Sequence, residues 1–301
     1  MSTALITGIE GFTGHYLAEA LRAAGFDVHG ISFGNKSECH QGVYICDLAD
    51  KHSLVKIVAN VQPDVIVHLA AIAFVAHGDV DEMYRTNIVG TRNLLEAAAK
   101  SPKAPSAILL ASSANIYGNA DIGTIFETVA PAPANDYAVS KLAMEYMAGL
   151  WIDRLPLFFV RPFNYTGVGQ SLNFLLPKIV DHFKRRAPIL ELGNLDVVRD
   201  FSDVRTVVQC YVRLLQTAAS PTVNLRGEAY NICSGKGYSL LDVIKMAEKI
   251  SGHSLEVKVN PAFVRNNEVK TLIGSRKKLE GAIGIVHDLS LTETLAWMLG
   301  N

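Results

Sequence analysis

The sequence contains no apolar run that approaches the roughly 20 residues needed to span a bilayer, because glycine, proline and charged residues interrupt every such stretch. Its N-terminus, "MSTALITG", lacks a basic region followed by a long apolar segment. The 4 cysteines, Cys39, Cys46, Cys210 and Cys233, stand in unrelated segments without the C-x-x-C spacing of a metal site. These absences predict a reduced, cytoplasmic protein with no membrane segment and no metal centre.

An excess of charge of either sign is also missing. The 28 Lys and Arg residues oppose 29 Asp and Glu residues, which leaves a formal net charge of -1. Such a chain has no general attraction for nucleic acid or an anionic membrane, so a phosphate-bearing ligand must be held by local donors. With 301 residues, 49% of them hydrophobic, the chain can bury a sizeable core without disulfides.

Short aliphatic runs alternate with amphipathic helical patterns through the first half of the chain. The strand-like segments include "ALIT", "DVHGISF", "DVIVHLAA" and "AILLASS", and the helix-like segments include "HYLAEALRAAG", "SLVKIVANV" and "NIVGTRNLLEAAAK". Strand and helix in strict alternation indicate βαβ units, whose parallel sheet needs helices on both faces. The predicted fold class is therefore α/β, with a doubly wound parallel sheet.

The regular alternation of strand-like and helix-like segments ends after "LFFVRPFN". Pro177 and Pro188 bracket a helix-like segment, and the later segments "EAYNICS", "SLLDVIKMAEKISG" and "LEVKVN" are typical of a smaller α/β region. We predict two interlocked domains. Residues 1–163 and about 194–228 form the doubly wound domain, and about 164–193 with 229–301 form the smaller C-terminal region.

A glycine-rich segment, "ITGIEGFTGHYL", joins the first predicted strand to the first helix. Gly8, Gly11 and Gly14 permit a tight turn and let backbone N–H groups approach a pyrophosphate at a helix N-terminus. Phe12 and Thr13, inside this segment, are expected to lie against the same ligand. The segment predicts a dinucleotide site.

The end of the second strand bears on the choice between NAD and NADP, because an acid there accepts from the adenosine ribose and repels a 2′-phosphate. Here "GISFGNKSE" places a neutral Ser32 at that point, with Lys36 nearby and no acid before Glu38. These residues favour NADP over NAD. Lys36 is equally explained as a solvated loop lysine.

Further strand ends supply candidate contacts for the cofactor. Asp47 in "CDLAD" is placed to bind the adenine amino group, with Leu48 packing against the ring. Ala70 and Ala71 in "HLAA" are small enough for the cofactor to lie across the backbone.

Two polar residues nearby have more ordinary explanations. We interpret His68 as a structural histidine. Asn87 begins a helical pattern, where it either serves as an N-terminal polar residue or helps to position the cofactor.

The segment "NDYAVSKLAMEY" places Tyr137 and Lys141 on one helix face, because positions i and i+4 share a face. "LLASSANIYG" ends a strand with Ser112 and Ser113, at the sheet edge where ligands sit in such folds. A lysine ammonium and an oxidised nicotinamide both favour the phenolate of Tyr137, and a serine hydroxyl can polarise a carbonyl. Together these groups predict proton transfer at a ketone or alcohol.

Taken in order, "TGIEGFTG", "HLAA", "SSANIYG", "YAVSK" and "RPFN" resemble the extended short-chain dehydrogenase/reductases over the whole chain. The resemblance implies a Rossmann-type cofactor domain, a Ser–Tyr–Lys catalytic set and a nucleotide-sugar substrate. It assigns the catalytic hydroxyl to Ser113, alongside Tyr137 and Lys141, and puts Ser112 near the nicotinamide.

The second half, with "RPFNYTGVGQ", "RDFSDVR" and "RNNEVKTLIGS", is similar to the GDP-6-deoxy-D-mannose reductases, which reduce GDP-4-keto-6-deoxy-D-mannose to GDP-D-rhamnose. This similarity implies a GDP-sugar substrate and a homodimer formed through the helices at 87–100 and 138–151. The substrate contacts that it implies are Ser113, Asn164, Lys178, Gly193, Arg199, Arg265 and Glu268.

Two departures from the family pattern concern the sugar. Tyr165 stands where a histidine is expected, Val168 stands where a proline is expected, and "IAFVAHG" is more apolar than its counterpart. A nucleotide-sugar 4-epimerase, or a reductase that gives the other C4 configuration (GDP-6-deoxytalose), therefore remains an alternative.

Overall fold

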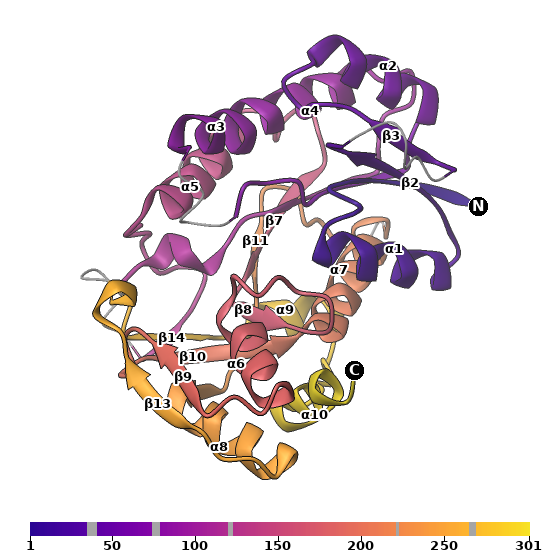
Figure 1. Cartoon of the computed structure of the whole chain (residues 1–301). Coiled ribbons are helices and arrows are strands. Elements are labelled where there is room, and N and C mark those ends of the chain that lie inside the picture. Colours follow the sequence, from indigo (N-terminus) through magenta and orange to yellow (C-terminus); the bar gives the residue numbers. More distant parts are fainter. Residues whose placement is uncertain (35–40, 74–78, 120–122, 221–222, 265–268) are drawn as a thin grey trace.

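The structure is a computed structural model that describes residues 1–34, 41–73, 79–119, 123–220, 223–264 and 269–301. A large sheet flanked by helices forms one part of the molecule, and a smaller α/β part that contains the C-terminus lies against it (Figure 1).

The large sheet has seven strands in the order β3-β2-β1-β4-β5-β7-β11, and every pairing between neighbours is parallel. Its strands are β1 (Ser2–Thr7), β2 (Phe26–Ser32), β3 (Val43–Ile45), β4 (Val65–His68), β5 (Ala107–Ala111), β7 (Leu157–Pro162) and β11 (Ala229–Ile232). The chain winds outward from β1 to β3 and then crosses to β4, so the strand order reverses between β1 and β4. This is the Rossmann arrangement, and the predicted fold class is confirmed.

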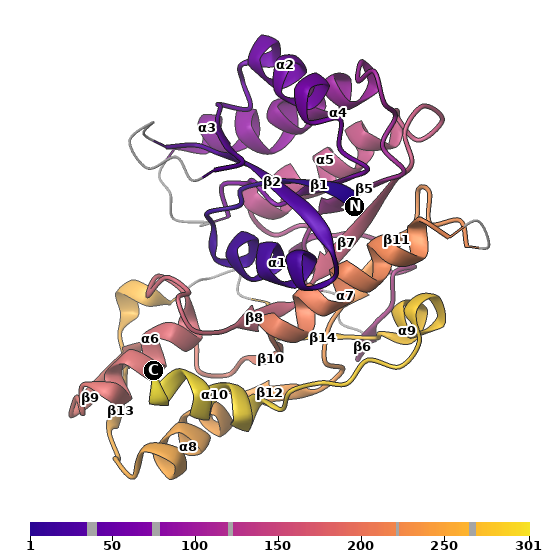
Figure 2. The same ribbon diagram turned by 90° about the vertical axis from the view of Figure 1, so that its right-hand side faces the viewer.

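Helices cover both faces of this sheet (Figure 2). One face carries α1 (Phe12–Ala23), α7 (Val204–Ala218) and α9 (Lys277–Ile283). The other carries α2 (Lys51–Val61), α4 (Thr91–Ala99) and α5 (Asp136–Gly149). Buried side chains such as Leu17 and Val207 fill the first layer, and Leu54, Leu94 and Met144 fill the second. The apolar stripe of each helix therefore faces the sheet, as a doubly wound fold requires.

The smaller part combines two short sheets with three helices. Its strands are β6 (Thr124–Ile125), β8 (Asn164–Thr166), β9 (Ile189–Leu192), β10 (Val198–Asp203), β12 (Gly237–Ser239), β13 (Glu256–Val259) and β14 (Thr271–Gly274). Its helices are α6 (Leu175–Lys184), α8 (Leu240–Ser251) and α10 (Leu291–Gly300). These helices enclose a core of their own that includes Phe183, Val243 and Leu295.

The arrangement differs from the expected domain boundaries at three strands. β6 was expected in the doubly wound domain, but it pairs with β14. β11 was expected in the smaller region, but it pairs with β7 at the edge of the large sheet. β10 was expected in the doubly wound domain, but it pairs with β8, β12 and β14. A strand as short as β11 has no local feature that chooses its sheet. The packing of Tyr230 and Ile232 in the large core decides it.

Two helical boundaries also differ from the sequence expectation. α6 begins at Leu175, two residues before Pro177, since proline in a first helical turn removes no hydrogen bond that the helix needs. Asn87 does not begin a helix. It lies within a π-helical turn, η2 (Arg85–Gly90), between α3 (Val80–Tyr84) and α4.

Across the part of the chain that the structure describes, no helix combines the length and the apolar character that a membrane crossing needs.

Candidate active site

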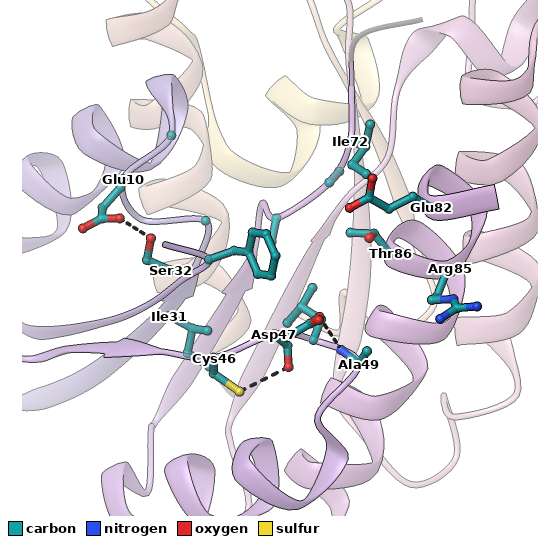
Figure 3. Close-up of a pocket in the computed structure, with 16 residues that line it drawn as sticks. Glu10, Ile31, Ser32, Cys46, Asp47, Ala49, Ile72, Glu82, Arg85 and Thr86 are labelled. Atoms are coloured by element: carbon teal, nitrogen blue, oxygen red, sulfur yellow. Dashed lines mark hydrogen bonds between the residues drawn. The ribbon is translucent and has the colours of Figure 1, made fainter. Parts of the chain in front are cut away.

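A cavity of about 550 Å³ opens at the carboxyl edge of the large sheet (Figure 3). Its walls come from the β1–α1 loop, the ends of β2, β3 and β4, and the segment that includes η2. The structure brings together these predicted cofactor residues at the cavity: Gly8, Gly11, Ser32, Asp47, Leu48, Ala70 and Ala71. The cavity thus lies at the switch in strand order, where doubly wound folds bind ligands.

The glycine-rich loop is shaped by close backbone approaches. Gly8 has φ of 74°, and a Cβ at this position would lie 2.9 Å from the backbone N of Ala70. A Cβ at Gly14 would lie 2.2 Å from the carbonyl oxygen of Gly8, so only glycine lets α1 begin this close to the loop. Gly11 precedes the helix without a side-chain cap, which leaves first-turn amides suited to an anion. The loop fits a dinucleotide pyrophosphate.

An acid from another segment lies against the end of β2, where the sequence predicted none. The Ser32 hydroxyl donates a hydrogen bond to the carboxylate of Glu10, which comes from the glycine-rich loop (Figure 3). The signal was the acidic side chain inside "TGIEGFTG", directly before Gly11. Lys36, on which the NADP expectation depended, lies outside the described residues.

Asp47 and Leu48 lie at the floor of the cavity after β3. The backbone N–H of Ala49 donates to Asp47 Oδ1 at 2.8 Å, which orients the carboxylate (Figure 3). Leu48 is buried against Gly90, where a Cβ would lie 2.8 Å from that of Leu48. An oriented acceptor beside an apolar side chain suits an amino-bearing aromatic ring.

Phe12 and Thr13 contact Tyr165 and do not line the cavity. Thr13 Oγ1 and the Tyr165 hydroxyl are 2.8 Å apart, and the Phe12 and Tyr165 rings stack with centroids 6.1 Å apart. In the sequence, Tyr165 is only a departure from the family pattern. The structure makes it the link between the glycine-rich loop and β8.

Asn87 and His68 are occupied by protein contacts. Asn87 Oδ1 accepts from the N–H of Ile72 at 2.9 Å, and its Nδ2 donates to Ile72 O and to Ser140 Oγ. Asn87 therefore ties the segment after β4 to α5. His68 lies between Thr7 Oγ1 at 2.6 Å and Thr91 Oγ1 at 2.8 Å, and burial lowers its pKa to about 3. A neutral, fully paired histidine agrees with the structural interpretation.

Ser113, Tyr137 and Lys141 lie where β5 and α5 meet. Ser113 caps the short helix η3 (Ala114–Tyr117), and the interaction of its hydroxyl with Tyr137 lowers the pKa of that phenol. Lys141 Nζ lies 6.0 Å from the centroid of the Tyr137 ring and donates to Ala111 O at 2.7 Å. The structure thus brings together the serine, tyrosine and lysine that the sequence singled out.

Burial dominates the electrostatics of this group. It raises the pKa of Tyr137, neighbouring Tyr165 raises it further, and the hydrogen bond with Ser113 lowers it. Burial also lowers the pKa of Lys141 to about 8, against the Glu145 carboxylate, which raises it. A Tyr137 phenol that keeps its proton at neutral pH is in the state that a proton donor needs.

The buried hydroxyl of Ser112 is independent evidence that a ligand binds here. Its side chain is 3% exposed, and its Oγ has no hydrogen-bond partner among the described residues. Buried hydroxyls are nearly always paired, so this orphan at the end of β5 fits a ligand group such as a carboxamide. Together with the glycine-rich loop, it shows that the residues present suit a nicotinamide dinucleotide.

Four of the predicted sugar-nucleotide contacts lie in the smaller part: Asn164, Lys178, Gly193 and Arg199. Lys178 Nζ donates to Glu191 O at 2.9 Å and lies 4.4 Å from the Phe263 ring centroid. A Cβ at Gly193 would lie 2.1 Å from Phe263 O, so Lys178 and Gly193 meet around Phe263.

Two other predicted substrate contacts, Arg199 and Asn164, differ in how far they are buried. Arg199 is buried in β10 and donates to the carbonyls of Val198 and Lys270. Asn164 is exposed at the start of β8. Arg265 and Glu268 lie outside the described residues.

The Rossmann sheet, the glycine-rich loop and the Ser113–Tyr137–Lys141 group define an extended short-chain dehydrogenase/reductase, as the resemblance predicted. Residues 5–298 match the GDP-mannose 4,6 dehydratase family, and the chain belongs to it. It is an NAD(P)-dependent oxidoreductase that modifies nucleotide sugars.

Two named relatives are similar over nearly their whole length. GDP-6-deoxy-D-talose 4-dehydrogenase of Aggregatibacter actinomycetemcomitans is 35% identical over 281 residues, which cover 93% of this chain and 90% of the relative. GDP-6-deoxy-D-mannose reductase of Pseudomonas aeruginosa is 30% identical over 307 residues, which cover 98% and 95%.

Two solved structures are similar in fold and sequence. The crystal structure of a Burkholderia cenocepacia J2315 protein, described as a proposed epimerase, has a TM-score of 0.92 and 51% identity, covering 99% of this chain and 97% of that one. The structure of RMD from Pseudomonas aeruginosa complexed with NADPH has a TM-score of 0.86 and 30% identity, covering 100% and 98%.

Proposed function

We propose that this protein reduces the 4-keto group of GDP-4-keto-6-deoxy-D-mannose to give GDP-D-rhamnose. The observation that carries the proposal is the grouping of Ser113, Tyr137 and Lys141, with the tyrosine and the lysine on one face of α5. A hydroxyl pair beside a buried lysine suits the interconversion of a ketone and an alcohol. The name of the Pseudomonas aeruginosa relative supports the substrate.

The proposed roles follow from the positions of the side chains. A bound reduced nicotinamide supplies the hydride for the C4 carbonyl carbon. Ser113 donates a hydrogen bond to the carbonyl oxygen, and Tyr137 transfers its phenolic proton to that oxygen. The Lys141 ammonium stabilises the phenolate that remains on Tyr137. The hydroxyl of Ser112 is placed to hold the carboxamide of the ring in register.

The nucleotide end of the substrate is assigned to the smaller part. Lys178 and Arg199 are cations suited to a diphosphate, and Gly193 allows close approach of the backbone beside Phe263. Asn164, exposed next to Tyr165 at β8, is assigned to the sugar or its diphosphate. Arg265 and Glu268 complete the proposed set, with a guanidinium for phosphate and a carboxylate for the ribose diol.

A second candidate is a reaction at the same carbon with the other configuration. The relative named GDP-6-deoxy-D-talose 4-dehydrogenase is 35% identical, and the structure described as a proposed epimerase is 51% identical. Tyr165 favours this candidate, because it adds a phenol beside Tyr137 where the family pattern has a histidine. Side chains such as Tyr165 determine the orientation of the bound sugar, and this orientation determines which face of C4 receives the hydride.

Product analysis separates these candidates. GDP-4-keto-6-deoxy-D-mannose is generated in place from GDP-mannose by a GDP-mannose 4,6-dehydratase, and the protein is added with NADH and NADPH in separate reactions. We expect consumption of one reduced cofactor per sugar and a product whose C4 hydroxyl is equatorial by its proton couplings in NMR. An axial C4 hydroxyl identifies the talose product. Interconversion of UDP-hexoses without net oxidation identifies an epimerase.

We also propose that the protein is a homodimer formed through α5 and the neighbouring η2–α4 segment. Val139 and Tyr146 on α5 and Leu150 directly after it are exposed, Tyr146 by 69% and Leu150 by 83%. Val89 in η2 is exposed on the adjoining segment. A row of exposed apolar side chains on two neighbouring helical segments fits a second copy of the same surface.

A further inference from the structure

We propose that Glu10 and Ser32 select NAD(H) over NADP(H) by accepting a hydrogen bond from the adenosine 2′-hydroxyl and repelling a 2′-phosphate. This inference rests on the proposed function only in assuming that a nicotinamide dinucleotide binds in the cavity. It reverses the preference for NADP that the neutral Ser32 favoured in the sequence.

The geometry places a carboxylate at the point that usually decides this choice. In doubly wound folds an acid at the end of the second strand binds the ribose hydroxyl. Here that strand, β2, ends at Ser32, and the acid is supplied by Glu10 from the glycine-rich loop (Figure 3). Both residues line the cavity, so the carboxylate stands at the same functional position although it comes from another segment.

The hydrogen bond between the two side chains also limits what Ser32 can offer. Ser32 is buried, and its hydroxyl proton is donated to Glu10. The hydroxyl oxygen then presents lone pairs to a ligand, and a phosphate, which is itself an acceptor, needs donors. A ribose hydroxyl is a donor and matches this pair, whereas a phosphate does not.

The charges around the cavity point the same way. The described lining residues include the carboxylates of Glu10, Asp47 and Glu82, and their only cation is Arg85. Arg85 lies on the opposite wall from Glu10 and Ser32, beside Glu82 and Thr86 (Figure 3). A 2′-phosphate beside Glu10 would bring like charges together without a described cation next to them.

Binding of the free dinucleotides tests the inference without a sugar substrate. Dissociation constants for NADH and NADPH are measured by calorimetry for the wild type, Glu10→Gln and Ser32→Ala. We expect the wild type to bind NADH at least about tenfold more tightly than NADPH. In NADPH the 2′-phosphate replaces the hydroxyl that would donate to Glu10, and its charge is repelled by that carboxylate. We expect Glu10→Gln to reduce this ratio about tenfold or more, mainly by tightening NADPH, and Ser32→Ala to reduce it less.

Glu19→Gln is the matched control, because Glu19 is an exposed acid on α1 and does not line the cavity. It removes the same charge and should leave the ratio unchanged. Tighter binding of NADPH by the wild type, or an unchanged ratio in Glu10→Gln, overturns the inference and leaves the proposed reductase intact. A wild-type preference for NADPH that Lys36→Gln abolishes would restore the expectation drawn from the sequence. Failure to bind either dinucleotide would overturn the proposed function together with this inference.

Discussion

Arg161 on β7 and Glu145 on α5 form a two-bond ion pair, with Nε to Oε1 at 2.9 Å and Nη2 to Oε2 at 2.6 Å. The side chains are 11% and 8% exposed. Arg161 also donates to the Tyr117 hydroxyl, which donates to Asn231 Oδ1. Because Glu145 lies one turn after Lys141, this network holds the helix of Tyr137 and Lys141 against the sheet.

Arg161→Met is expected to lower the free energy of unfolding by about 3 to 5 kcal/mol, because it leaves a buried carboxylate without its partner. Urea denaturation followed by circular dichroism measures the change. The control is Arg92→Met. The Arg92 side chain is 52% exposed and lies 3.4 Å from Glu96, so its loss should cost about 1 kcal/mol or less. The double variant Arg161→Met with Glu145→Leu should recover part of the loss, and equal stability of Arg161→Met and wild type would show that the pair contributes little.

Tyr137→Phe is expected to lower turnover by about 10² or more while leaving the binding of the dinucleotide nearly unchanged. It removes the proton donor but keeps the ring, and general acid catalysis commonly supplies about 10² to 10⁴-fold. Steady-state kinetics with the ketosugar and calorimetry with the cofactor measure the two quantities. Tyr146→Phe is the control. It changes an exposed tyrosine on the same helix and should leave both turnover and cofactor binding unchanged. Turnover in Tyr137→Phe close to that of the wild type would remove Tyr137 from the mechanism.

The rate of reduction is expected to fall as pH rises through about 8. Burial lowers the pKa of Lys141 to that value, so its ammonium is present below pH 8 and lost above it. Without this charge the phenolate left by proton transfer is less stable, and kcat/KM should decrease. The profile of kcat/KM between pH 6 and 10 measures the effect. A flat profile up to pH 10 would show that the charge of Lys141 is not needed in the reaction.

His68→Leu is expected to lower the free energy of unfolding by about 1 to 3 kcal/mol, because it breaks the bridge between Thr7 and Thr91. In the wild type the buried imidazole has a pKa of about 3, below the ordinary 6.5, so the unfolded state binds more protons between these values. The histidine therefore makes stability fall as pH decreases below about 6.5. The variant should lose less stability than the wild type between pH 7.5 and 5, as denaturation at both pH values would measure. A variant that is fully stable but inactive would instead indicate a catalytic role.

Tyr146→Glu combined with Leu150→Glu is expected to shift the protein from dimer to monomer, because two charges would be buried in the proposed interface. Light scattering during size-exclusion chromatography gives the mass. Leu241→Glu changes an exposed leucine on α8 in the smaller part and should leave the dimer intact. A monomeric wild type, or a charged variant that stays dimeric, would contradict the assigned surface.

Features that depend on local spacing could be predicted from the amino-acid order alone. The alternation of short aliphatic runs with amphipathic helical patterns predicted the doubly wound sheet, and helical spacing alone placed Tyr137 and Lys141 on one face. The need for glycine at positions 8 and 14 is also local. Gly8 has a positive φ, and a Cβ at Gly14 would collide with the carbonyl oxygen of Gly8.

The contacts between residues far apart in the sequence could not be predicted from local patterns. β11 joined the large sheet through its pairing with β7, although its four residues would suit either sheet. Glu10 met Ser32 across 22 positions of sequence, and Arg161 met Glu145 across two elements. Such contacts depend on the packing of the whole chain, since periodicity specifies which face of an element is buried but not which element lies against it.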